Sequence, residues 1–77
     1  YGPVVIDLPQ AVEIELALYN LTGQKVATLA HGRREAGTYS LLWNGRDEDG
    51  RELASSVYLY RLQAGSQLET RKLLLLR

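Results

Sequence analysis

Cysteine, methionine and phenylalanine are all absent from this sequence of 77 residues. Without cysteine, neither a disulfide bond nor a thiolate-bound metal can hold the chain together. The longest run of aliphatic residues, Leu73–Leu76, is far too short to span a membrane. The N-terminal residues Tyr1-Gly2-Pro3-Val4 have neither the basic nor the apolar region of a signal peptide.

An excess of charge of either sign is also missing, because nine Lys and Arg balance nine Asp and Glu. A nucleic-acid partner is therefore not expected, since binding to phosphates requires a basic surface. The single histidine, His31, lies between an alanine and a glycine in a stretch expected to be an exposed polar loop, residues 31–37. No nucleophile–base pair or metal-ligand cluster stands out, so we expect no enzyme activity, no cofactor and no small-molecule substrate.

The length and composition indicate one small domain, residues 1–77. Apolar residues make up 45% of the chain, enough for one thin hydrophobic core. A tyrosine is an unusual first residue for a translated protein, so we expect the domain to be the C-terminal part of a larger, secreted protein.

A period of two residues dominates the sequence. In Val12–Tyr19 the apolar residues Val12, Ile14, Leu16 and Leu18 alternate with Glu13, Glu15, Ala17 and Tyr19, which is typical of a half-buried strand. Further strands are expected at 4–8, ended by Pro9 and lying at a sheet edge, and at 25–30, 38–43, 57–64 and 68–76, with a short one at 51–54. Frequent turns and the lack of a helical pattern predict an all-β, Ig-like or fibronectin-III-like antiparallel β-sandwich of six to seven short strands.

Acidic residues cluster in Asp47-Glu48-Asp49-Gly50, with Asn44 nearby. They could contribute oxygen ligands to calcium, but their spacing does not match a known calcium loop. The alternative is a pair of turns in which Asp and Asn side chains bind nearby backbone groups, and this alternative is favoured. Likewise, Asn20-Leu21-Thr22 matches a glycosylation acceptor, although a tight turn explains Asn20 equally well.

Five aromatic residues, Tyr19, Tyr39, Trp43, Tyr58 and Tyr60, occur on or beside the expected strands. They could form a platform for carbohydrate, but aromatic residues that alternate along strands more often pack in the core. Tyr58 is placed like the tyrosine corner of an Ig-like sandwich, and Trp43 is expected to be its large core residue.

The end of the chain stops alternating. The segment combines three cations with four leucines and no acid: Arg71, Lys72, Leu73, Leu74, Leu75, Leu76 and Arg77. Either it is a strand covered on both faces, or it is an exposed edge that a partner recognises by adding a strand to the sheet. Such an edge would also allow a homodimer paired through the last strand.

Four segments in order carry a family resemblance. Residues 18–26 (LYNLTGQKV), 36–50 (AGTY, then WNGRD and Gly50), 57–62 (VYLYRL) and 70–75 (TRKLLL) resemble the C-terminal sorting domains of the type IX (Por) secretion system. The same pattern is similar to the Ig-like domain of flagellar hook-capping proteins. One departure is Ser56, where the sorting family usually has a glycine, so a need for positive φ there would strain the chain.

The resemblance implies a sorting signal that directs a cargo protein through the outer-membrane translocon to the cell surface. Its implied partners are the type IX translocon and a sortase-like signal peptidase. Its implied location is the periplasm in transit, then the cell surface or the medium. Arg71, Lys72, Leu73–Leu76 and Arg77 match the recognition strand of that family. We expect the last few residues, 73–77, to be needed for export but nearly dispensable for folding.

Two alternatives stay open. One is a structural Ig-like interaction module, resembling the hook cap or a cell-surface spacer. The other, less favoured, is a carbohydrate-binding accessory module, which would need exposed tyrosines.

Overall fold

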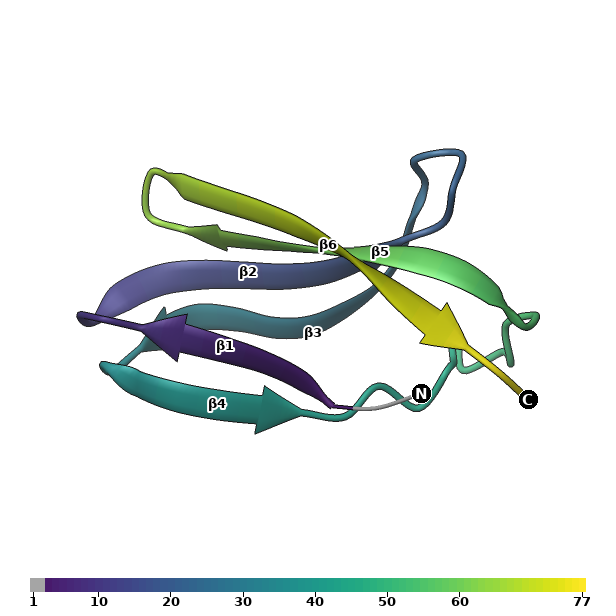
Figure 1. Cartoon of the computed structure of the whole chain (residues 1–77), viewed down its shortest axis with the longest axis horizontal. Coiled ribbons are helices and arrows are strands. Elements are labelled where there is room, and N and C mark those ends of the chain that lie inside the picture. The colour runs from purple at the N-terminus through teal and green to yellow at the C-terminus, as the bar shows by residue number, and fades with distance from the viewer. Residues whose placement is uncertain (1–2) are drawn as a thin grey trace.

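The structure, a computed structural model, describes residues 3–77 and places six strands in two sheets (Figure 1). The strands are β1 (Val4–Leu8), β2 (Val12–Tyr19), β3 (Lys25–Arg34), β4 (Gly37–Leu41), β5 (Ser56–Ala64) and β6 (Gln67–Leu75). One sheet has the order β3-β2-β5-β6 and the other pairs β1 with β4, all antiparallel. The predicted all-β sandwich is confirmed. No helix within residues 3–77 is long and apolar enough to cross a membrane.

Strand β2 lies in the interior of the larger sheet, and its alternating pattern suits burial on one face. Ile14, Leu16 and Leu18 are buried, as the sequence predicts, while Glu13 remains exposed. Ala17, on the opposite face, is also buried. The strand pairs with β3 on one side and with β5 on the other, so both of its edges are covered.

The turn between β2 and β3 is built by one asparagine. The Asn20 Oδ1 atom accepts hydrogen bonds from the backbone N–H groups of Thr22, at 3.1 Å, and Gln24, at 2.9 Å. Gly23 adopts a φ of +89°, which glycine takes at little cost. The turn expected at this position is confirmed, and the Asn20 side chain is engaged within it.

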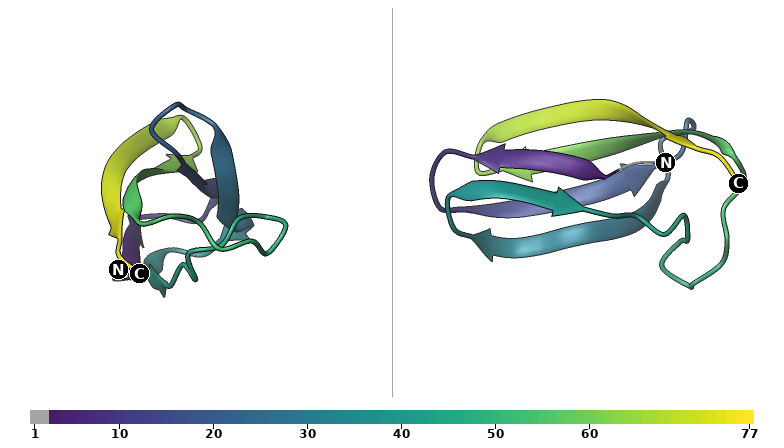
Figure 2. Two further views of the ribbon diagram at one scale, coloured as in Figure 1. Left: turned by 90° about the vertical axis from the view of Figure 1, so that its right-hand side faces the viewer. Right: turned by 60° about the horizontal axis from the view of Figure 1, so that its bottom comes forward.

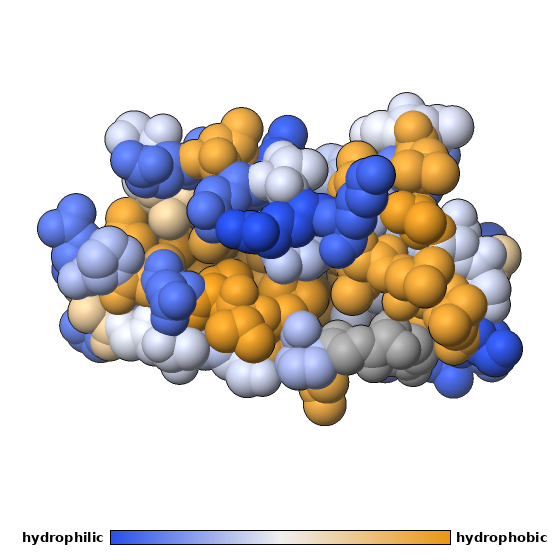
Figure 3. All heavy atoms as spheres, viewed as in Figure 1, coloured by the Kyte–Doolittle hydropathy of each residue, from blue (hydrophilic) through white to orange (hydrophobic). Residues whose placement is uncertain are grey.

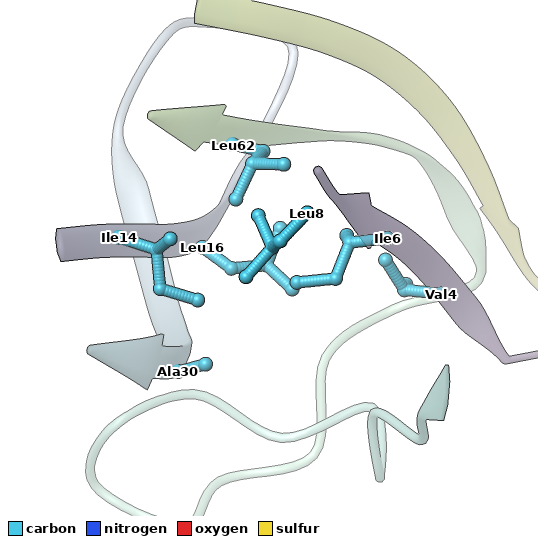
Figure 4. Packing of buried hydrophobic residues seen from close by; sticks show 7 residues of the cluster. All are labelled: Val4, Ile6, Leu8, Ile14, Leu16, Ala30 and Leu62. Carbon is cyan, nitrogen blue, oxygen red and sulfur yellow. The ribbon is translucent and has the colours of Figure 1, made fainter. Parts of the chain in front are cut away.

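The core between the sheets consists of two clusters. The first lies beneath β1, where Leu8, Leu16 and Leu62 point toward one another from three strands (Figure 4). Its seven buried members are Val4, Ile6, Leu8, Ile14, Leu16, Ala30 and Leu62. The contacts between β1 and the larger sheet hold the two layers together, since burial of such side chains provides the main stabilising free energy.

The second cluster fills the end of the sandwich that the long β4–β5 connection closes (Figure 2). Its buried members are Leu18, Ala27, Trp43, Tyr58 and Leu75. The rings of Trp43 and Tyr58 meet edge to face, with centroids 5.2 Å apart. The expectation that Trp43 is a large core residue is confirmed, because only 2% of it is exposed.

Three expected boundaries were wrong. Strand β3 continues through His31 to Arg34, in place of the expected polar loop, because the first half of β2 needs a partner: Glu13 faces Arg33 and Glu15 faces His31. Strand β4 ends at Leu41, so Trp43 enters the core from the connection that follows. Residues 51–54 form no strand, only a single bridge between Arg46 and Glu52.

Candidate functional site

The last strand, β6, lies at an edge of the four-stranded sheet and pairs only with β5. Its side chains from Gln67 to Lys72 are exposed on both faces. Figure 3 shows strongly polar side chains across the middle of this face of the molecule, where Figure 1 places β6, with apolar side chains beside them. The candidate recognition segment therefore begins on an accessible edge.

The two cations at the start of this segment are solvated. Arg71 lies 3.9 Å from the carboxylate of Glu69, two residues earlier on the same face of β6, and both side chains are exposed. Lys72 is exposed on the other face of the strand. An ion pair in this setting contributes little to stability. Folding therefore does not account for either cation.

The four leucines alternate in burial, although their sequence does not. Leu73 is half-buried, and Leu75 is completely buried in the second core cluster. Leu74 and Leu76 point outward and are 51% and 64% exposed. Neither alternative from the sequence is therefore right for the whole segment, because one half of the run packs in the core and the other faces solvent.

Arg77 is bound to the connection between β4 and β5. Its backbone N–H donates to Ser55 Oγ at 2.9 Å, and its Nε donates to the Leu53 carbonyl at 2.7 Å. Its Nη1 donates to Glu52 Oε2 at 2.8 Å, and its Nη2 donates to the Gly45 carbonyl. These contacts argue against the expectation that loss of the last residues spares folding, because Leu75 is buried in the core and Arg77 binds this connection.

These partners of Arg77 were missed from the sequence. Glu52 is the one carboxylate among them, and nothing in the spacing of residues 25 positions apart indicates that they meet. Gly45 alone carries a weak sequence signal, because a glycine can mark a position where another group approaches the backbone closely. Gly45 has a φ of +75°, and an added Cβ there would lie 2.6 Å from Nη2 of Arg77.

The acidic segment in the same connection forms turns. Asp47 Oδ1 accepts hydrogen bonds from the backbone N–H groups of Asp49 and Arg51, both at 2.9 Å. Asn44 Oδ1 accepts one from Arg46 at 3.0 Å. The turn interpretation is confirmed. Across residues 3–77, no group of three or more His, Cys, Asp or Glu side chains is arranged to hold a metal ion.

The tyrosines are used mostly within the fold. The Tyr58 hydroxyl donates to the Ala54 carbonyl at 2.7 Å, which confirms the tyrosine-corner geometry. The Tyr39 hydroxyl donates to the Glu35 carbonyl at 2.7 Å, and the Arg61 guanidinium stacks over the Tyr19 ring. Ser56 causes no strain, because no residue other than glycine among those described has positive φ.

A groove separates β6 from β1, across the gap between the two sheets. Pro3, Ile6 and Asp7 line it on one side, and Glu69 and Arg71 line it on the other. Its volume is about 440 Å³. A second hollow continues it along β1, toward Leu8 and Val12. The inner face of β6 therefore looks onto open space along its first half, instead of onto a covering strand.

Comparisons with known proteins agree with this architecture. The sequence model of the FlgD Ig-like domain matches residues 2–67. A solved structure titled as that of FlgD from P. aeruginosa superposes with a TM-score of 0.73 at 23% sequence identity, over 95% of this chain. That match spans 56% of the other chain's length, and at this identity it shows a shared fold. The search of curated proteins found no match.

These findings support the hook-cap side of the resemblance seen in the sequence and give no support to the type IX sorting side. They establish the Ig-like sandwich. The family model covers 66 of the 77 residues, from residue 2 to residue 67. The chain belongs to the FlgD Ig-like domain family.

Proposed function

We propose that this domain is a non-catalytic, Ig-like interaction module of the hook-cap type, which serves in the assembly of a larger structure. The family match over residues 2–67 carries this proposal. The packing is consistent with it, because the conspicuous aromatic and acidic residues serve the core and the turns. Among the accessible features are the open edge of β6 and the groove beside it.

A C-terminal sorting signal is the second candidate, and one structural observation favours it. Leu74, Leu76 and Lys72 remain accessible beside the exposed cation Arg71, and folding does not account for them. A translocon or a sortase-like peptidase that reads an apolar and basic strand would find these side chains available. No comparison supports this candidate.

An export experiment with a reporter protein distinguishes the two proposed functions. A fluorescent reporter with an N-terminal signal peptide is fused ahead of residues 1–77 in a bacterium that has a type IX system, with an established sorting domain as positive control. For an assembly module, we expect this fusion to remain in the periplasm while the control reaches the surface. Surface display of the fusion would overturn the proposal.

The variant for this experiment must keep its fold. Deleting residues 73–77 would remove the buried Leu75 together with the contacts of Arg77, so a loss of export would report unfolding. Leu74→Ser combined with Leu76→Ser changes only exposed side chains. If the wild-type fusion is exported and this folded double variant is not, sorting through the tail replaces our proposal.

A further inference from the structure

The hairpin between β5 and β6 determines which backbone groups of β6 are free. Its turn has two residues, Gly65 and Ser66, with Gly65 at a φ of +60°, and Ala64 faces Gln67 across it. Residues that flank a two-residue turn exchange backbone hydrogen bonds, and along an antiparallel ladder every second pair does so. The N–H and C=O groups of four alternate residues in β6 therefore point away from β5: Leu68, Thr70, Lys72 and Leu74.

The alternating side chains of β6 separate its charges. Glu69 and Arg71 lie opposite Leu62 and Tyr60 of β5, so they share the inner face and overhang the groove next to β1. Lys72 lies on the outer face. The opposite charges of Glu69 and Arg71 flank Thr70 symmetrically. A two-fold axis through Thr70 would therefore place each charge opposite its counterpart in a second copy.

The two-fold registers centred near Thr70 differ in the charges that they place opposite one another. A second β6 strand can satisfy the free backbone groups only in registers that pair outward-pointing residues with one another. Among such registers centred within residues 69–72, an axis at Glu69 pairs two carboxylates. An axis at Arg71 pairs two guanidiniums, and one at Lys72 pairs two ammonium groups; like charges directly opposite destabilise a sheet. Only the axis at Thr70 produces two attractive pairs and no repulsive one.

We propose that two copies of this domain pair through β6, antiparallel and centred on Thr70, with Glu69 of each copy facing Arg71 of the other. The result is a continuous eight-stranded sheet across the dimer. The groove beside β1 provides room for the inner side chains of the incoming strand. This inference rests on the proposed assembly function and deepens it by naming the partner.

A charge-swap experiment tests the register, with the molar mass of the purified domain measured by light scattering over a range of concentrations. Wild type is expected to form a dimer. Glu69→Arg places Arg opposite Arg twice, and Arg71→Glu places Glu opposite Glu twice. The dissociation constant of each variant's own dimer should therefore be at least about tenfold higher than that of wild type. An equimolar mixture should restore the dimer, because both cross-strand pairs become attractive again.

The double variant Glu13→Arg with Arg33→Glu reverses the charges of two residues that face each other in β2 and β3, away from β6, so it should dimerise like wild type. Thermal melts test whether every variant is folded. A wild-type domain that stays monomeric at all concentrations overturns the inference, as expected if the charged edge blocks pairing or receives a strand from a different protein. Failure of the mixture to restore the dimer, or loss of the dimer in the folded double variant of Glu13 and Arg33, also overturns it. None of these outcomes alters the export test of the proposed function.

Discussion

At the scale of single residues, adjacent side chains of identical chemistry differ in burial. Leu74 and Leu75 are adjacent leucines in one run, yet Leu75 is fully buried against Trp43 and Leu18 while Leu74 is half exposed. The direction of each side chain in a strand decides this difference, because successive residues point to opposite faces. Composition therefore identifies an apolar tail, and only position within the strand assigns each leucine.

Replacing these leucines one at a time tests this division. Leu75→Ala should lower the free energy of unfolding by about 2–5 kcal/mol, because it removes buried methyl groups and leaves a cavity. That is a large share of the roughly 4–12 kcal/mol expected for a domain of this size. Leu74→Ala, the matched control, should cost less than about 0.5 kcal/mol. Denaturant titrations measure both, and equal losses would contradict the assigned burial.

At the scale of elements, the end of β6 and the β4–β5 connection stabilise each other. The connection has no strand of its own apart from the Arg46–Glu52 bridge, and the hydrogen bonds of Arg77 tie it to the sheet. Gly45 makes this contact feasible, since its missing side chain leaves space for the guanidinium. This contact therefore depends on Gly45 and Arg77, which are 32 positions apart along the chain.

Gly45→Ala tests the contact between Gly45 and Arg77, with Gly50→Ala as the matched control. Both glycines have positive φ, at +75° and +81°, so both substitutions should cost about 1–2 kcal/mol in backbone strain. Only the Cβ at position 45 would meet Arg77, so Gly45→Ala should cost about 1 kcal/mol more. In the double variant with Arg77→Ala, most of this extra cost should disappear, because only the milder approach of the added Cβ to Leu75 Cδ1 at 3.1 Å remains. A double-mutant cycle of thermal unfolding detects the change. Strict additivity would argue against the contact.

At the scale of the whole molecule, the two core clusters share partners and should unfold together. Leu29 and Tyr60 pack against both clusters. The single tryptophan, Trp43, lies in the second cluster and reports on it alone, whereas far-ultraviolet circular dichroism reports on both sheets. We expect the two signals to change at the same denaturant concentration, as in a two-state transition. A fluorescence change that precedes the loss of strand signal would show that the second cluster unfolds independently.

Local sequence signals predicted much of the fold. The alternation in Val12–Tyr19 identified β2 and its buried face, and Asn20 with Gly23 marked the first turn. Such features depend on the chain's own periodicity and on short-range hydrogen bonds, which are encoded within a few residues. The boundaries failed where a neighbouring strand decides the outcome, as in the extension of β3 to Arg34 opposite Glu13 and Val12.

For the candidate site, the sequence by itself determined that residues 71–77 are unusual, because their composition departs from an alternating strand. It could not determine which of them are available to a partner. That was decided by the tertiary structure, which buries Leu75 in the second cluster and ties Arg77 to Leu53, while β6 keeps an open edge. The physical reason is that burial depends on what packs against a side chain. Trp43 lies in the cluster with Leu75 from 32 positions away along the chain, and Ser55 and Leu53 bind Arg77 from 22 and 24 positions away.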